Sequence, residues 1–314
     1  MFHDWYLDKN KDNIKAFETW ECNRNKNERE KIERKSLDKQ KKWLEDVFII
    51  PLAKKKEEMF KTKVNDIDFQ LFYLQDDDFN RLQQYLPQNS ILIKISFILK
   101  KPYTSKDDGE FHIVYVNGSP KIFENPIVRD KLTGLPMVKP STWKGHLRFA
   151  AERVERDDEA EKEKAIRRLF GSETDDSEAL RGRLYFFPTF FEELPEKDVI
   201  TPLERSSRTP RRGPIDLEII GAEKKGMLHL LYFPYPKGNH YTDKEVDEDS
   251  KFLADSLKLM LYTYGFSAKK TSGFGVINKL QGQDIGITPE GFKKYFSVLC
   301  SSRGEIGEGE KSDR

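Results

Sequence analysis

Two cationic residues stand four positions apart at the start of an expected helix. In the stretch "VKPSTWKGHLR", which runs from Val138 to Arg148, these are Lys144 and Arg148. Residues four apart lie on the same face of a helix. Ser141 and Thr142, just before them, are residue types that commonly cap helix N-termini. Because free backbone N–H groups at a helix start bind phosphate, these four residues together predict a cradle for an anion.

The cations of this helix also have an ordinary explanation. Surface helices commonly carry basic residues, and Lys144 and Arg148 can instead pair with Glu152 or Asp157. Both explanations stay open on the sequence alone. His146 lies between the two cations, and we expect it to be a spectator.

A glycine-containing loop supplies a second candidate site. The stretch "KKTSGFGV" places Lys269 and Lys270 before Gly273 and Gly275, at the start of an expected strand. Glycines let a backbone or a phosphate approach closely, and the lysines supply positive charge. A tight turn or a β-bulge would use the same glycines, so this pattern alone does not decide between the two.

A third candidate is the arginine-rich stretch "RSSRTPRRGP" at 205–214, which includes Arg208, Arg211 and Arg212. Its proline and glycine residues favour irregular backbone, and its hydroxyl and guanidinium groups are typical phosphate contacts. An exposed loop without a ligand would have the same composition.

Strands and helices are expected in an order that would position these stretches. Alternating or apolar runs predict strands, and turn residues between them predict hairpins. The expected strands cover 90–101, 111–116, 180–191, 215–220, 227–235 and 274–280. Helices are expected over 78–86, from the opening stretch to Gly171 in two pieces, and over 243–265, with a hairpin between "PIVRD" and "PMV".

From residue 90 onward this order is β-α-β-β-α-β with insertions, as in ferredoxin-like and RRM-like folds. We therefore predict an α+β protein, with a ferredoxin-like palm, inserted hairpins and a thumb-like loop. The expected domains are a charged, helical N-terminal extension (1–88), the palm (89–285) and a C-terminal segment with a polar, disordered tail (286–314). Because this fold hosts many functions, it does not assign one.

The composition excludes several classes of protein. The chain has 314 residues, of which 55 are basic and 54 acidic, so any nucleic-acid site must be local. Cys22 and Cys300 do not form a C-x-x-C pair, which argues against a zinc site and suits a reducing cytosol. No apolar run approaches the ~18 residues that span a membrane, and the start does not resemble a signal peptide. We predict a cytoplasmic protein without a membrane partner.

The order of the candidate stretches along the chain is more informative than any one of them alone. The stretches "ENPIVRDKLTGLPMVKPSTWKGHLR", "RRLFGS", "RGRLYFFPTFF" and "TSGFGVI" follow one another along about residues 90–282. This ordered series resembles the RAMP superfamily, the repeat-associated proteins that form the backbone of type III CRISPR effector complexes. The resemblance is greatest to the repeating subunit that holds guide RNA and cuts target RNA, and it leaves out the first 88 residues.

The resemblance implies a palm that binds crRNA, with neighbouring subunits of a multi-protein complex stacked along it and target RNA as a further partner. The cations at the start of the first helix would contact the crRNA backbone, the glycine loop would lie against the same RNA, and "ITPLERSSRTPRRGPI" would be the thumb-like loop. The expected RNA-binding residues are Arg129, Ser141, Thr142, Lys144, Arg148, Arg208, Arg211, Arg212, Lys269, Lys270, Thr271, Ser272, Gly273 and Gly275.

The resemblance also suggests a catalytic residue. In members that cut RNA, an acidic residue, usually Asp, stands two residues before the proline of this segment, and here that residue is Glu124 in "FENP". Mg²⁺ would be the cofactor if Glu124 is catalytic, and the sequence does not indicate which residues would complete a metal site. Asp107 and Asp108 are weaker candidates because no motif places them.

Four alternatives remain open at this level. The first is a subunit that cuts target RNA through Glu124, and the second is an inactive scaffold or end-of-filament subunit. The third is a stand-alone endoribonuclease that processes guides with acid–base groups such as His. A phosphometabolite enzyme on the same fold is the remaining reading.

Overall fold

The computed structural model describes residues 81–106, 112–116, 119–123, 125–130, 133–172, 180–201, 213–234 and 241–300. The chain divides into two compact units. The described part of the larger unit lies within 81–104, 138–191 and 220–300, and that of the smaller unit lies within 105–137 and 192–219.

A four-stranded antiparallel sheet forms the centre of the larger unit. Its strands are β1 (Ile91–Ile98), β5 (Leu184–Phe186), β9 (Lys225–Tyr232) and β10 (Ile285–Thr288), in the spatial order β10-β1-β9-β5. The alternation of "ILIKISFI" places every second residue of β1 on one face. The apolar side chains on that face are almost fully buried, so burial of this face fixes the register of the sheet.

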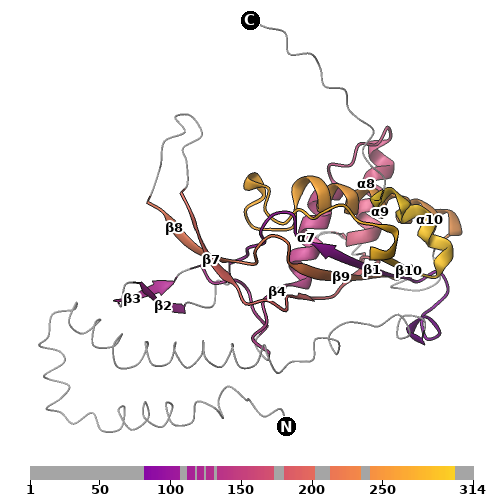
Figure 1. Cartoon of the computed structure of the whole chain (residues 1–314). Helices are drawn as coiled ribbons and strands as arrows, with labels where there is room; N and C mark the ends of the chain where they lie inside the picture. Colours follow the sequence, from indigo (N-terminus) through magenta and orange to yellow (C-terminus); the bar gives the residue numbers. More distant parts are fainter. Residues whose placement is uncertain are drawn as a thin grey trace, which may run out of the picture. The chain divides into compact units, whose positions relative to one another are not determined.

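Helices connect these strands and cover the buried face. They are α7 (Pro140–Ala151), α8 (Glu159–Phe170) and α9 (Asp243–Leu259), and α9 continues as a π-helical turn, η3 (Met260–Tyr264). Figure 1 shows α7, α8 and α9 on the same side of β1 and β9. Along the chain the larger unit therefore has the predicted β-α-β-β-α-β order, with α7 and α8 together filling the first helical position.

Short elements complete the larger unit. They are β6 (Thr189–Phe190), η4 (Lys270–Ser272), η5 (Gly282–Asp284), η6 (Glu290–Phe292), α10 (Lys293–Phe296) and η7 (Ser297–Leu299). In the described part of the chain, no helix is long and apolar enough to cross a membrane.

An aromatic cluster anchors α7 in the core of this unit. The ring centroids of Trp143 and Phe266 are 4.3 Å apart, and Phe97 packs edge-on against both rings. The Trp143 indole Nε1 donates a hydrogen bond to Thr189 Oγ1 at 3.1 Å, so its polar atom is satisfied inside the core. Burying one such large side chain contributes about 1.5–3 kcal/mol. This anchor fixes which face of α7 points to solvent.

The stretches "RRLFGS" and "RGRLYF" meet where α8 ends and β5 begins. Gly171 terminates α8 with a φ of +92°, and it bridges to Arg181. At Gly182 an added Cβ would lie 2.6 Å from the carbonyl oxygen of Leu169. Such a distance is far below van der Waals contact, so the close backbone approach requires glycine at position 182.

The smaller unit contains two hairpins. β2 (His112–Val116) pairs with β3 (Ser119–Phe123), and β7 (Glu196–Ile200) pairs with β8 (Ile215–Ile219). A further strand, β4 (Met137–Val138), lies at the end of the predicted "PIVRD"–"PMV" hairpin.

That hairpin is confirmed by its turn. The Asp130 N–H donates to the Leu135 carbonyl at 2.8 Å, and the Thr133 hydroxyl donates to the Asp130 carboxylate at 2.7 Å. Gly134 adopts a φ of +76°, which glycine tolerates best.

Several expected strands differ from the observed ones. The strand expected over 180–191 is split into β5 and β6 around Pro188, which lacks an N–H for the ladder. The strand expected over 274–280 is wrong, because only Ile277 bridges to Leu99 there. The last strand of the sheet is instead β10, and β3 and β7 were not expected.

The N-terminal extension falls largely outside the described residues. Of the helix expected over 78–86, residues 81–83 are helical and the chain then turns.

Candidate nucleic-acid interface

The start of α7 differs from the expected capped helix. Lys139 is the N-cap residue and makes no side-chain capping hydrogen bond, and Pro140 is the first helical residue. Ser141 and Thr142 therefore lie inside the first turn, and their expected role as N-caps is wrong. Proline takes the first position because its fixed φ suits a helix and its missing N–H costs nothing there.

This start nevertheless leaves backbone donors available. The first four N–H groups of a helix have no partner inside the helix, although the Trp143 N–H reaches the Lys139 carbonyl at 3.1 Å. The first turn contains no acidic residue. The positive end of the helix dipole is thus not neutralised by a side chain of its own first turn.

The two cations of α7 share one helix face, as expected, and that face points to solvent. Trp143 and Leu147 point into the core and are fully buried, whereas Lys144 is exposed and the Arg148 side chain is 35% exposed. Arg148 Nε donates to Glu152 Oε1 at 3.3 Å. Glu152, one of the two alternative carboxylate partners, therefore does contact one of the helix cations, Arg148.

The glycine loop forms a tight turn. Gly273 has a φ of +74° and ends η4, and an added Cβ there would meet open space. Gly275 has a φ of +78°, and an added Cβ would lie 2.7 Å from the Ser267 backbone nitrogen. A tight turn therefore accounts for both glycines without a ligand: Gly273 is required by its backbone angle and Gly275 by close packing.

Side chains of the loop contact α7 directly. The Lys270 ammonium lies 3.5 Å from the centroid of the Phe149 ring, and the Arg153 guanidinium carbon lies 3.5 Å from the same centroid. The Tyr264 ring at the end of η3 packs edge-on against Phe149 at 5.2 Å. The loop, the end of α9 and the outer side of α7 thus form one surface that carries several cations. We call it the α7–loop surface and define it by Lys144, Arg148, Phe149, Arg153, Lys269 and Lys270.

Charge and burial at this surface lower two pKa values. Burial, together with the neighbouring Lys270, lowers the pKa of His146 to about 4. Burial and then the Arg153 charge lower the pKa of Lys270. His146 is therefore neutral at pH 7, and its Nδ1 is buried without a hydrogen-bond partner in the described part of the chain.

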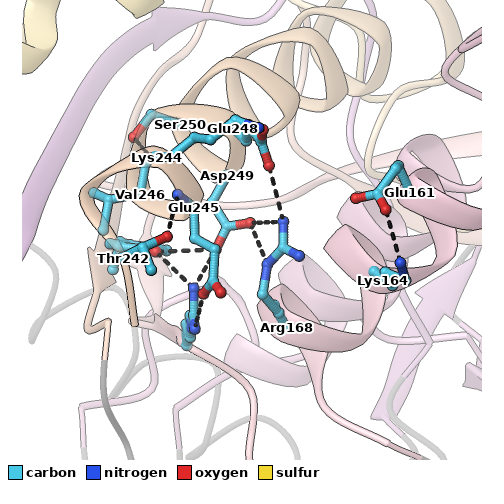
Figure 2. Close-up of polar contacts among 12 residues, drawn as sticks. Glu161, Lys164, Arg168, Thr242, Lys244, Glu245, Val246, Glu248, Asp249 and Ser250 are labelled. Carbon is cyan, nitrogen blue, oxygen red and sulfur yellow. Dashed lines mark hydrogen bonds and ion pairs between the residues drawn. The ribbon is translucent and has the colours of Figure 1, made fainter. Parts of the chain in front are cut away.

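A buried ion-pair network lies elsewhere in the larger unit (Figure 2). Asp249 on α9 is fully buried, and its carboxylate accepts hydrogen bonds from Arg168 Nε at 2.9 Å and Arg183 Nη1 at 2.8 Å. The Tyr232 hydroxyl donates to the same carboxylate at 2.9 Å. Burial raises the pKa of Asp249, and the two guanidinium groups oppose that effect.

This network explains two arginines that sequence analysis did not single out. Arg168 belongs to "RRLFGS" and Arg183 to "RGRLYF", and Figure 2 shows Arg168 reaching from α8 toward Asp249. Together they tie α8 and β5 to α9. Buried charges persist only when they are paired, so these residues hold the helices in place and are not part of an open interface.

Comparison with protein families decides what kind of protein this is. The model of the RAMP superfamily matches residues 108–278. The chain belongs to the RAMP superfamily. The match includes α7, α8, α9 and the glycine loop, so the α7–loop surface is built from elements of the RAMP domain.

No curated protein matches the chain. Among solved structures, this RAMP chain is similar to a chain of the type III-B Cmr-beta complex bound to cognate target RNA, at 16% identity and a TM-score of 0.45. That alignment covers 76% of each chain. It is also similar to a chain of a type IV-B CRISPR complex, at 12% identity and a TM-score of 0.37, over 63% of this chain and 91% of that chain.

Arg129, in the smaller unit, has a partner within that unit. Its guanidinium lies 3.2 Å from the Glu218 carboxylate, and the two side chains are only 13% and 9% exposed. Glu218 also accepts a hydrogen bond from the Ile127 N–H at 3.0 Å. This pair links the segment before the hairpin to β8, which gives Arg129 a structural role.

The remaining predicted site residues of this RAMP protein fall outside the described residues. They are Glu124, Asp107, Asp108, Arg208, Arg211 and Arg212, and only the backbone of Thr271 is described. Ser272 is exposed next to Gly273. In the part of the chain that the structure describes, no three His, Cys, Asp or Glu side chains come together as metal ligands.

Proposed function

We propose that this RAMP protein is a crRNA-binding backbone subunit of a type III CRISPR effector complex in the cytoplasm. Its partners would be crRNA, target RNA and the other subunits of the complex. The α7–loop surface would contact the phosphate backbone of the guide. The observation that carries this proposal is the contact of Lys270 with Phe149, because it joins the cations of the loop and of α7 into one surface.

The chemistry of this surface suits a polyanion. Lys144 and Lys269 are exposed, and Lys144 and Lys270 have no carboxylate within ion-pair distance among the described residues. Lys and Arg contacts to phosphate oxygens set the position of a nucleic acid without reading its sequence. A subunit that holds guides of many sequences needs contacts of this kind.

Cleavage of target RNA is a separate part of the proposal. Glu124 would be the catalytic residue because it occupies the acidic position of the motif, and Mg²⁺ would be its cofactor. Mg²⁺ is typically bound by one or two carboxylates and keeps several waters, so a single Glu is compatible with it. An inactive scaffold or end-of-filament subunit would bind the same guide and lack this cut.

A guide-processing endoribonuclease is the third possibility, and His146 is the only histidine in a matched motif. Its low pKa keeps the imidazole neutral, but its Nδ1 is buried. A general acid–base group must reach the proton that it transfers. Only Nε2 is left to reach a substrate, and no second histidine of a matched motif is available as its acid–base partner, so the binding subunit is the better-supported possibility.

The test is a double substitution, Lys144→Ala with Arg148→Ala, in the full-length protein. Binding to guide-length RNA should weaken equally for unrelated sequences. The slope of log affinity against log salt should become shallower by about 1.4, since two phosphate contacts on a single strand are lost. Lys164→Ala with Lys244→Ala, at exposed lysines of α8 and α9, is the matched control, and it should change neither quantity. An unchanged affinity and slope in the α7 variant, with its melting temperature preserved, would contradict the proposal.

A further inference from the structure

Glu152 lies between two arginines of the α7–loop surface. It directly follows α7, and its two carboxylate oxygens contact different partners. Oε1 is 3.3 Å from Arg148 Nε, and Oε2 is 3.7 Å from Arg153 Nη1. One carboxylate thus partly neutralises two of the cations that the proposed RNA site would use.

These contacts are weak enough to be exchanged. The side chains of Arg148, Glu152 and Arg153 are 35%, 46% and 42% exposed. Exposed ion pairs contribute only about 0–1 kcal/mol. The contrast within the same unit is Asp249, which is fully buried and lies 2.8 Å from both Arg168 and Arg183. That carboxylate cannot leave its partners without exposing the core, whereas the Glu152 carboxylate can turn into water.

Arg153, which makes the longer of the two contacts with Glu152, is also held in place by other groups. Arg153 Nη1 donates to the Phe149 carbonyl at 2.8 Å, and its guanidinium stacks on the Phe149 ring. Lys270 lies at the same 3.5 Å from that ring, and one ring face cannot hold two groups so close. The two cations therefore occupy opposite faces. Both would stay in position if the Glu152 carboxylate moved away.

We propose that Glu152 is an internal competitor for RNA, and this rests on the proposed function. In the protein without RNA, its carboxylate occupies the positions on Arg148 and Arg153 that a phosphate of the guide backbone takes on binding. A free phosphate ion gains little by replacing it. A phosphate in a strand that Lys144 and Lys270 already hold has a high effective concentration at this point. Glu152 would thus favour long strands over single anions.

The test is Glu152→Gln, which removes the charge and keeps the shape. Its effect should have the opposite sign to that of most interface substitutions: RNA binding should become about three- to tenfold tighter at low salt. The gain should shrink as salt rises, because salt screens exposed charges. Glu163→Gln on α8 is the control, since it changes the net charge equally and Glu163 makes no ion pair among the described residues. It should leave the affinity within about twofold of the unmodified protein.

A second set of variants tests the mechanism. When Arg148 and Arg153 are both replaced by Ala, adding Glu152→Gln should no longer tighten binding, because its effect acts through those arginines. In addition, inorganic phosphate must displace the same carboxylate, so its weak binding should tighten in the Glu152→Gln variant by at least the factor seen for RNA, and both gains should require the two arginines. A gain that persists without the arginines would overturn the proposal.

The outcome can be separated from that of the proposed function by elution from heparin, a polyanion unrelated to guide RNA. If Glu152→Gln elutes later than Glu163→Gln, the competitor role is supported. If the unmodified protein binds no guide RNA, the proposed function is refuted, but the competitor role for polyanions is not. The competitor role would be overturned if the two variants eluted together or if Glu152→Gln bound RNA more weakly than the unmodified protein. This holds whether or not the unmodified protein binds guide RNA.

Discussion

The Lys270 ammonium lies 3.5 Å from the centroid of the Phe149 ring and thereby joins two segments that are far apart in the sequence. Each segment has an ordinary explanation by itself: α7 is a surface helix with a Glu152–Arg148 pair, and the loop is a tight glycine turn. Their contact creates one cationic surface that neither explanation requires. The proposed RNA site depends on this relationship.

The first prediction concerns the aromatic platform. Phe149→Leu should weaken RNA binding about fivefold, because Lys270 and Arg153 each lose a cation–π contact of about 0.5–1 kcal/mol. The same two contacts stabilise the folded protein, so the melting temperature should also fall, by a few degrees, without loss of the fold. Phe187→Leu, at another partly exposed phenylalanine of the larger unit, serves as the control. Equal RNA affinity in the two variants would show that the platform has no role in binding.

The second prediction concerns the buried network. Asp249→Ala should lower the free energy of unfolding by about 3–5 kcal/mol, because it leaves two guanidinium groups without their buried carboxylate. Asp255→Ala removes a half-exposed partner of Arg156 and should cost only about 0–1 kcal/mol. Urea denaturation measures both. Similar losses for the two variants would mean that the network contributes no more than a surface pair.

The third prediction concerns acid stability. Burial lowers the pKa of His146 and of His229 to about 4, and Lys270 and Lys94 respectively add to the effect. In the unfolded chain both titrate near 6.5. Between pH 6.5 and pH 4 the unfolded chain binds more protons, so these groups reduce stability as the pH falls, by at most about 1.4 kcal/mol per pH unit each.

The measurement is the pH dependence of the melting temperature. Because buried carboxylates such as Asp249 also titrate, the useful quantity is the difference between a variant and the unmodified protein. His229→Gln should flatten the decline between pH 6.5 and pH 4 and leave the slope above pH 7 unchanged. Parallel curves for the variant and the unmodified protein would contradict the assignment.

The fourth prediction concerns cleavage. In the assembled complex, Glu124→Ala should abolish Mg²⁺-dependent cutting of paired target RNA at one register and leave guide binding unchanged. Glu124→Asp should retain or increase the rate, since it restores the side-chain length usual in the family. The assay uses labelled target RNA. If the cut survives Glu124→Ala, the catalytic group lies elsewhere, and Asp107 and Asp108 are the next substitutions to make.

Strong local signals account for the parts of the fold that the sequence predicts. The alternation of β1, the turn at Gly134 and the helix ends at Gly171 and Gly265 all depend on neighbouring residues. The strand β10 was missed because it is short and its pairing with β1 is decided by the tertiary fold. The wrong expectation for Ser141 has a local cause, since Pro140 takes the first helical position.

The candidate site was predicted only in part. The shared face of Lys144 and Arg148 follows from helical spacing, whereas the expectation that the glycine loop lies near the same ligand came from the family resemblance. The role of Phe149 could have been suspected, because Arg153 stands four residues after it. Its contact with Lys270 is tertiary and leaves no local pattern. The contacts of Asp249 are also tertiary, because Arg168 and Arg183 both lie far from it in the sequence.

The most direct test of the central claim is ultraviolet crosslinking of the protein, purified with its bound nucleic acid, followed by mass spectrometry of the crosslinked peptides. The proposal predicts a short, uniform RNA that crosslinks to peptides from 140–153 and 269–275. The contradicting result would be a protein without RNA, or crosslinks confined to another place. One such place is the polar groove of about 500 Å³ beside β10 that Lys94, Gln283 and Lys293 line.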